Sequence, residues 1–327
     1  MRLNLYICTL AVIMMFGCVS SSNIGNGNVA TVGVDTFSEE KGLLAIDSML
    51  AEVDTLTLPV PSSVISYNVE DACIVDGNIY LLDQANNIMA YSLETGKLVC
   101  SINAQGRGHG EYVKPAAIAS DKDNVYVLDM AGLAVNSYDR NLKFKERINI
   151  GFPCLDLEKT ETGFLLYNLN ANDDVGRIVV TDNGGVMVND FLKTDIDIRN
   201  PLPTKHIFQK NGKAVCIIDP WSFAVYKYED EVLEHIASLE YNDAASQPVR
   251  PVSAFIVNNK VISQYWSKFV MTSIHDTVSG KSQSGIAGTG KSDYGFMPIV
   301  QHANSLYGIY PDTNEGSCYH LVKYRFR

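Results

Sequence analysis

The sequence predicts an all-β fold, a six-bladed β-propeller whose last blade is closed by an N-terminal strand. The first observation is a short apolar strand, often ended by a polar residue, that returns six times at intervals of about 45 residues. The second is the turn chemistry between the strands, and the third is an incomplete last repeat. Repeats of this length are typical of propeller blades. The six copies begin at Asn78, Asn124, Gly163, Ala214, Val261 and Ser305.

Each blade is expected to be a four-stranded antiparallel meander whose first strand lines the central channel. Turn residues that tolerate positive φ separate the strands, for example Asp76-Gly77-Asn78 in the first blade and Asp182-Asn-Gly-Gly185 in the third. The sixth blade starts near Met297 and leaves room for only three strands. The alternating segment Val53 to Leu58 is the natural fourth strand, so it should close the ring.

The N-terminus has the pattern of a targeting segment. Arg2 precedes an apolar run, Leu3 to Gly17, that is too short for a membrane span. Because Cys18 follows Gly17 directly, the segment resembles a bacterial lipoprotein signal that is cleaved before a lipidated cysteine; the alternative is an ordinary secretory signal. We therefore expect a signal peptide at 1–17, lipidated Cys18 with a flexible tether at 18–52, and the propeller at 53–327. Residues 38–52 could add a short helix.

The net charge limits the kinds of binding partner that can be expected, and the cysteine content limits the disulfides. A net charge of −11 argues against nucleic acid and against electrostatic adhesion to anionic membranes, so lipid on Cys18 would have to provide the membrane anchor. The five cysteines beyond Cys18 form an odd, scattered set, and most lie in apolar strand patterns where cysteine packs as a small hydrophobic residue. No disulfide framework is expected.

A second repeat, Gly-x-Gly-x-x-acid-Tyr, joins neighbouring blades at 106–112 and 288–294. Its glycines permit a tight turn toward the channel, where the acid and the tyrosine would meet the start of the next inner strand. The loops could simply brace adjacent blades, or they could contact a ligand at the channel mouth. Asp71 should lie near this mouth. The candidate ligand-binding residues are Arg107, His109, Glu111, Tyr112, His206, Arg250, Lys291, Asp293 and Tyr294.

Together these features resemble the six-bladed, TolB-like propeller lipoproteins of Bacteroidetes-type bacteria. The resemblance covers nearly the whole mature chain, although His109 replaces a proline of the family's connector and Ser292 replaces a glycine. It implies a cell-envelope location and brings no catalytic residues. Surface-exposed members often carry acidic residues after the lipidated cysteine. Residues 19–22 lack them, which favours the periplasmic face of the outer membrane.

The remaining motifs give little support for a nucleotide or metal site. Residues 285–292 match the P-loop pattern, but the polar stretch before them cannot be a buried strand, and Pro298 lies too close for a helix to follow. No nucleotide is therefore expected. The six histidines lack metal-ligand spacing, so no metal site is predicted. The oxygen-rich stretches 168–174 and 312–315 make Ca²⁺ conceivable, and solvated turns are the simpler interpretation.

Two classes of function remain, with a purely structural role in an outer-membrane assembly as a third. The favoured hypothesis is a non-enzymatic envelope lipoprotein that binds a ligand, glycan or protein partner through one propeller face. The alternative is a propeller hydrolase or lyase acting on a glycan, lactone or peptide in the central channel, with or without Ca²⁺. Such an enzyme needs oxygen ligands or acid–base groups that converge from several blades.

Overall fold

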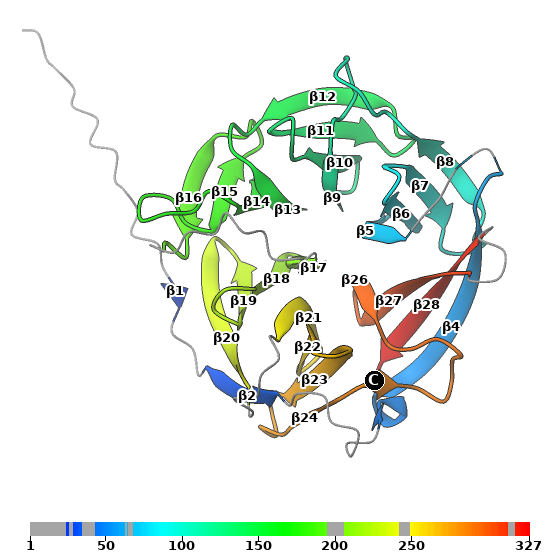
Figure 1. The fold of residues 1–327 in the computed structure, drawn as a ribbon, viewed down its shortest axis with the longest axis vertical. Coiled ribbons are helices and arrows are strands. Elements are labelled where there is room, and N and C mark those ends of the chain that lie inside the picture. The colour runs from blue at the N-terminus through cyan, green and yellow to red at the C-terminus, as the bar shows by residue number, and fades with distance from the viewer. Residues whose placement is uncertain are drawn as a thin grey trace, which may run out of the picture.

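The computed structural model describes residues 24–25, 29–34, 43–62, 64, 68–194, 206–241, 249–312 and 318–327. These residues form six radially arranged sheets, each built on four antiparallel strands, around a central channel (Figure 1). The predicted six-bladed β-propeller is therefore confirmed. The signal peptide and Cys18 lie outside the described residues. Within the described part of the chain, no helix has the length and hydropathy needed to cross a membrane.

Blades one to five run outward from the channel in chain order, and blade six takes its outer strand from the N-terminal part of the chain. Blade one contains β5 (Val69–Val75), β6 (Asn78–Asp83), β7 (Ile88–Ser92) and β8 (Leu98–Ile102). Blade two contains β9 (Pro115–Ser120), β10 (Asn124–Asp129), β11 (Ala134–Asp139) and β12 (Phe144–Asn149). Blade three contains β13 (Cys154–Lys159), β14 (Gly163–Asn168), β15 (Ile178–Asp182) and β16 (Met187–Phe191).

The second half of the ring repeats this order. Blade four contains β17 (Phe208–Asn211), β18 (Ala214–Asp219), β19 (Ala224–Glu229) and β20 (Val232–Tyr241). Blade five contains β21 (Arg250–Val257), β22 (Lys260–Trp266), β23 (Val270–Asp276) and β24 (Ser282–Gly285). Blade six contains β26 (Pro298–His302), β27 (Ser305–Pro311), β28 (Cys318–Phe326) and β4 (Leu50–Pro59).

The ring closes in blade six, where the N-terminal strand β4 pairs antiparallel with the C-terminal strand β28 (Figure 1). Their register runs from Leu50 opposite Phe326 to Pro59 opposite Cys318. This confirms closure by an N-terminal strand. The strand starts three residues earlier than the predicted Val53, because Leu50 is apolar and fully buried and continues the pairing.

Two expectations about residues 18–52 are corrected where the structure describes them. A flexible tether was expected, but β2 (Ala30–Val34) adds a parallel strand to the outer edge of β20, beside the two-residue β1 (Ile24–Gly25). The predicted helix is replaced by β3 (Leu44–Ala45), which pairs with β25 (Ala287–Gly288), and by one 3₁₀ turn, η1 (Asp47–Met49).

The physical reason for both corrections is a period of two in the burial pattern. Val32 and Val34 are buried on one side of β2, and Leu44 and Ile46 are buried likewise farther along. Alternate residues face one side of an extended chain, whereas a helix would bury residues three or four apart. Leu44 and Ile46, whose spacing suggested the apolar face of a helix, therefore lie in an extended segment.

The hydrophobic core is divided among the interfaces between blades. Six clusters of buried residues can be distinguished in the described part of the chain, one at each interface around the ring. The first recurring strand illustrates this arrangement. Tyr80 and Leu82 pack toward blade two, whereas Ile79 and Leu81 pack toward blade six. The recurring strand is thus apolar throughout because both of its faces are buried.

Candidate functional site

A cavity of about 440 Å³ occupies the central channel, where the inner strands of five blades converge. It is lined by residues of β5, β9, β13, β17 and β26 and by the turns that follow them. The cavity therefore lies where the inner strands end. The blade connectors lie at the opposite end, where these strands begin.

Two aspartates of the cavity wall join neighbouring inner strands. The Asp71 carboxylate accepts hydrogen bonds from the backbone amides of Ala72 at 2.9 Å and of Ile118, in blade two, at 2.8 Å. Asp156 makes the same connection between blades three and four, since its Oδ2 accepts from the amide of Phe208 at 3.0 Å. Burial, followed by the charge of Asp71, raises the pKa of Asp156 well above its usual value. Both residues therefore connect neighbouring blades around the channel.

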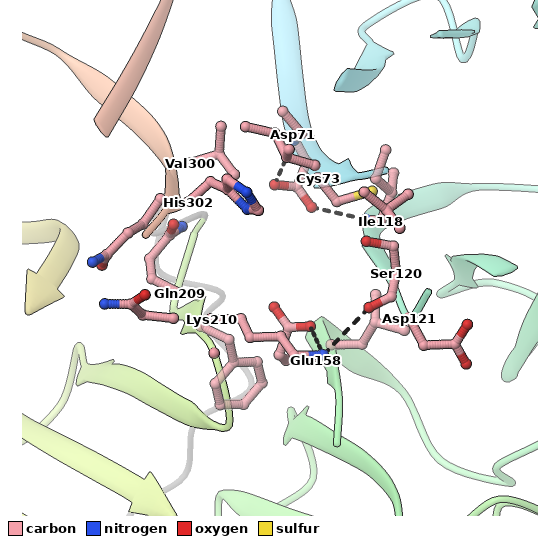
Figure 2. A pocket seen from close by; sticks show the side chains of 18 of the residues that line it. Asp71, Cys73, Ile118, Ser120, Asp121, Glu158, Gln209, Lys210, Val300 and His302 are labelled. Atoms are coloured by element: carbon pink, nitrogen blue, oxygen red, sulfur yellow. Dashed lines mark hydrogen bonds and ion pairs between the residues drawn. The ribbon is translucent and has the colours of Figure 1, made fainter. Parts of the chain in front are cut away.

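Glu158 and Lys210 form an ion pair in the cavity wall. The Lys210 ammonium lies 3.8 Å from Glu158 Oε1 and donates to the carbonyl oxygens of Ser120 at 3.3 Å and Lys159 at 2.5 Å. Figure 2 shows this pair facing Asp71 across the cavity. Burial raises the pKa of Glu158 to about 7, although Lys210 opposes the shift. Glu158 can therefore exchange a proton near neutral pH.

The cavity offers more hydrogen-bond acceptors than donors. Five acidic residues line it, against two lysines and His302. Gln301 adds a further acceptor, because its side chain is only 4% exposed and its Oε1 has no hydrogen-bond partner, while its Nε2 donates to the Ile256 carbonyl at 2.7 Å. A buried acceptor without a partner is costly, so a ligand or a water molecule is expected there. The arrangement suits a polar ligand that carries several donors.

The first connector braces blades one and two. Tyr112 is fully buried in their interface, and its hydroxyl donates to the Asn86 carbonyl at 2.8 Å. Glu111 folds back onto its own loop and accepts from the Gly108 amide at 2.6 Å. The His109 ring packs edge-on against Phe144. Tyr112 consequently offers no surface to a ligand.

Arg107 and Glu111 line a separate cavity of about 320 Å³ together with Arg147 and Asp129. Asp129 is fully buried, accepts from the amides of Val113 and Lys114, and pairs with Arg147 at 3.3 Å. These bonds tie the end of the connector to blade two.

The second connector is held differently. Asp47, from the N-terminal segment, accepts from the Thr289 hydroxyl at 2.6 Å and from the Gly290 amide at 3.2 Å. These hydrogen bonds lower the pKa of Asp47. Lys291 donates to the Leu50 carbonyl at 3.3 Å, and Asp293 is exposed. Tyr294 is half-buried and stacks on the rings of Tyr310 and His320, with centroids 5.1 Å away in each case.

The other two predicted ligand-binding residues, His206 and Arg250, are not brought together with the rest. His206 Nδ1 lies 3.1 Å from Asp71 Oδ1, so His206 contacts the cavity only through its wall. Arg250 is exposed at the start of β21. None of the nine predicted residues lines the central cavity.

Glu158, Lys210 and Asp156 were missed at the sequence level. A usable indication was present, because Asp156 and Glu158 are charged residues two positions apart inside a strand expected to line the channel. Such residues point to the same face.

The stretch that matches the P-loop pattern is not followed by the helix that a nucleotide-binding loop requires. It contains the end of β24 and the short strand β25, and residues 289–297 form turns and irregular structure. Among the described residues, the one group of three ligand-type side chains whose atoms lie within 4.8 Å of one another is Asp312, Cys318 and His320, outside the channel.

Six blades in one ring, with a polar cavity at its centre, define the chain as a six-bladed β-propeller. Residues 23–269 match the family described as 6-bladed beta-propeller (DUF5128), and the chain belongs to that family. No curated protein matches the sequence.

Solved structures with the same fold include two Bacteroides proteins. One is a Bacteroides fragilis protein named for its inferred export, 15% identical, with a TM-score of 0.71, covering 91% of this chain and 99% of that one. The other is a DUF4221 family member from Bacteroides vulgatus, 9% identical, with a TM-score of 0.57, covering 85% of this chain and 97% of that one.

Proposed function

We propose that this protein is an exported, lipid-anchored propeller that binds a small ligand rich in hydroxyl or amine donors in its central cavity. The observation that carries the proposal is the cavity wall, where Glu158, Gln301 and Lys210 present polar atoms from three different blades. A cavity of about 440 Å³ has room for a sugar unit or a peptide end. The excess of acceptors favours a neutral or cationic ligand over an anionic one.

The binding test uses the mature protein and a panel of monosaccharides, amino sugars, disaccharides and dipeptides in isothermal titration. A ligand found in this way should lose at least about tenfold in affinity in Glu158→Gln and in Lys210→Met, since each loses a charged hydrogen-bonding group. Glu111→Gln is the matched control, because its carboxylate lies at a connector and not in the cavity. Equal weakening by all three variants, or by none, would contradict binding in the channel.

Export and lipidation are part of the same proposal. They rest on the apolar run at residues 3–17 and on Cys18 directly after Gly17, and the Bacteroides fragilis neighbour carries a name that refers to export. We expect the protein at the periplasmic face of the outer membrane. Labelled palmitate should be incorporated into the wild type and not into Cys18→Ala. Protease added to whole cells should leave the protein intact; digestion would place it on the cell surface instead.

One observation favours a second function, acid–base catalysis on a glycan, lactone or peptide. Glu158 has a pKa of about 7 and lies beside Lys210, which suits a general acid or base at neutral pH. Turnover of a panel of aryl glycosides, lactones and aminoacyl anilides would then show an inflection near pH 7. Glu158→Gln should abolish that turnover, and turnover that persists in this variant would exclude the role.

A further inference from the structure

Three residues with metal-binding side chains meet where β27 ends and β28 begins in the ring-closing blade. The backbone amide of Asp312 donates to the Cys318 carbonyl at 3.0 Å, so the two residues face each other across the hairpin. Cys318 and His320 are two residues apart on β28 and therefore point to the same side of the strand. All three are partly accessible to solvent.

The atoms that could bind a metal are already close together. Cys318 Sγ lies 3.6 Å from Asp312 Oδ2 and 3.9 Å from His320 Nε2. In a tetrahedral zinc site, bonds of about 2.3 Å to sulfur and about 2.0–2.2 Å to nitrogen or oxygen place the ligand atoms roughly 3.3–3.7 Å apart. The two distances from Cys318 Sγ are within a few tenths of an ångström of these values, and the atoms of Asp312 and His320 lie within 4.8 Å of each other.

The histidine ring is held in place by the second connector. Tyr294 stacks on His320 with an interplanar angle of 28° and on Tyr310 with an angle of 25°. Tyr310 is itself fixed, because its hydroxyl donates to the Gly295 carbonyl at 2.6 Å and accepts from the Met297 amide at 3.0 Å. The stack therefore sets the direction in which Nε2 points, as groups around metal-binding histidines commonly do.

The chemistry of the three side chains also favours a cation. A thiolate, an imidazole and a carboxylate form a donor set that suits Zn²⁺ better than the hard ions Ca²⁺ and Mg²⁺.

We propose that Asp312, Cys318 and His320 bind one Zn²⁺ ion and leave its fourth position to water or to an exchangeable ligand. Binding forms a zinc–sulfur bond and releases the Cys318 proton to solvent, so affinity rises with pH. The ion fastens the ends of β27 and β28 in the blade that closes the ring. It also protects a partly exposed thiol from oxidation.

The test uses the full mature protein with a tag that contains no histidine, stripped with a chelator and titrated with ZnCl₂ in a calorimeter. One ion should bind per chain. Cys318→Ser and His320→Gln should each weaken binding by more than about 100-fold, since loss of a supporting residue alone costs 10–100-fold. Tyr294→Leu should weaken it by about tenfold, the lower end of that range, because it removes a positioning residue that makes no hydrogen bond to the imidazole.

Matched controls are Cys100→Ser, which removes the other partly exposed thiol of the described residues, and His302→Gln, which removes an imidazole at the end of β26 in the central cavity. Both should bind as the wild type does. Co²⁺ gives an independent readout, since a thiolate ligand produces a charge-transfer absorption that must disappear in Cys318→Ser. Circular dichroism verifies that the variants are folded. Wild-type binding no tighter than that of Cys318→Ser, or a Co²⁺ spectrum without the thiolate band, would overturn the proposal.

Discussion

The two blade connectors have the same sequence pattern and different structures. In each, a carboxylate accepts a hydrogen bond from the amide of the second glycine, Gly108 or Gly290. The first connector supplies that carboxylate itself, from Glu111, whereas the second receives it from Asp47, more than 200 residues away in sequence. Both connectors therefore pair the amide of this glycine with a carboxylate, but a different part of the chain supplies the carboxylate in each.

The different source of the carboxylate changes where the other residues of each motif lie. Glu111 is one methylene longer than Asp293, which lets its carboxylate reach back to the Gly108 amide. With Asp47 in this role, Asp293 stays exposed, and Tyr294 is only half-buried, because it packs at the margin of the cluster between blades five and six and stacks on Tyr310. A repeated motif therefore sets the path of the chain, and the local surroundings decide whether its side chains are structural or accessible.

The largest effect is expected from removing the strand that contacts the second connector through the Leu50 carbonyl and also closes the ring. Deleting residues 50–59 removes β4, the outer strand of blade six, and leaves β28 with an open edge. We expect no cooperative unfolding transition in this variant, measured by circular dichroism during a temperature ramp. A folded, monomeric variant would show that the ring does not need the N-terminal strand.

Truncating the two tyrosines tests their different burial directly. Tyr112→Ala creates a cavity between blades and should lower the free energy of unfolding by about 3–5 kcal/mol. Tyr294→Ala removes a half-buried ring from a stack and should cost about 1 kcal/mol. Urea unfolding of both variants measures the difference. Equal losses would mean that both connectors are braced to the same extent.

Glu158 lies outside both connectors, so the effect of pH on its contribution to stability serves as a reference for the connector variants. Its folded-state pKa of about 7 lies above its ordinary value of 4.5, so stability is full below pH 4.5 and is lost as the pH rises toward 7. Relative to the wild type, Glu158→Gln should gain about 1–3 kcal/mol between these values. Denaturant unfolding at several pH values measures this gain, and a constant difference across the range would refute the raised pKa.

The smallest expected effect separates the glycines of the two loops. A Cβ on Gly106 would lie 2.0 Å from the Glu111 carboxylate oxygen, whereas a Cβ on Gly288 would meet nothing within 4 Å. Gly106→Ala should therefore displace Glu111 and cost about 1 kcal/mol, the value of its hydrogen bond. Gly288→Ala should be close to neutral. Paired thermal unfolding curves can resolve the two, and a loss in Gly288→Ala would point to a constraint on that backbone.

The sequence was sufficient for the ring because each recurring strand is apolar on both faces, a local pattern that repeats with every blade. It was sufficient for ring closure because the last repeat lacked a strand. The strand β2 was not predicted, since Ala30 to Val34 is short and rich in small residues, and only its contact with β20 identifies it as a strand.

The candidate sites depended on contacts between distant residues. Glu158 and Lys210 meet because inner strands of adjacent blades lie side by side, which no local pattern reveals. Asp312 and His320 are joined by the register of one hairpin, and an eight-residue separation gives no standard ligand spacing. The connectors attracted attention because they are repeated, and repetition reports shared geometry more reliably than shared function.

The pairing of β4 with β28 also fixes the order of events during biosynthesis. The first strand of the ring to be synthesised pairs with the last one, so blade six cannot be completed before residues 318–326 are made. The length of the intervening chain is a minor obstacle, because each doubling of a closed loop costs only about 0.6 kcal/mol. The delay matters more, since an unpaired β4 is an exposed edge open to aggregation. A nascent chain of this protein therefore benefits from being kept extended until its C-terminus is released, as transport in an unfolded state would do.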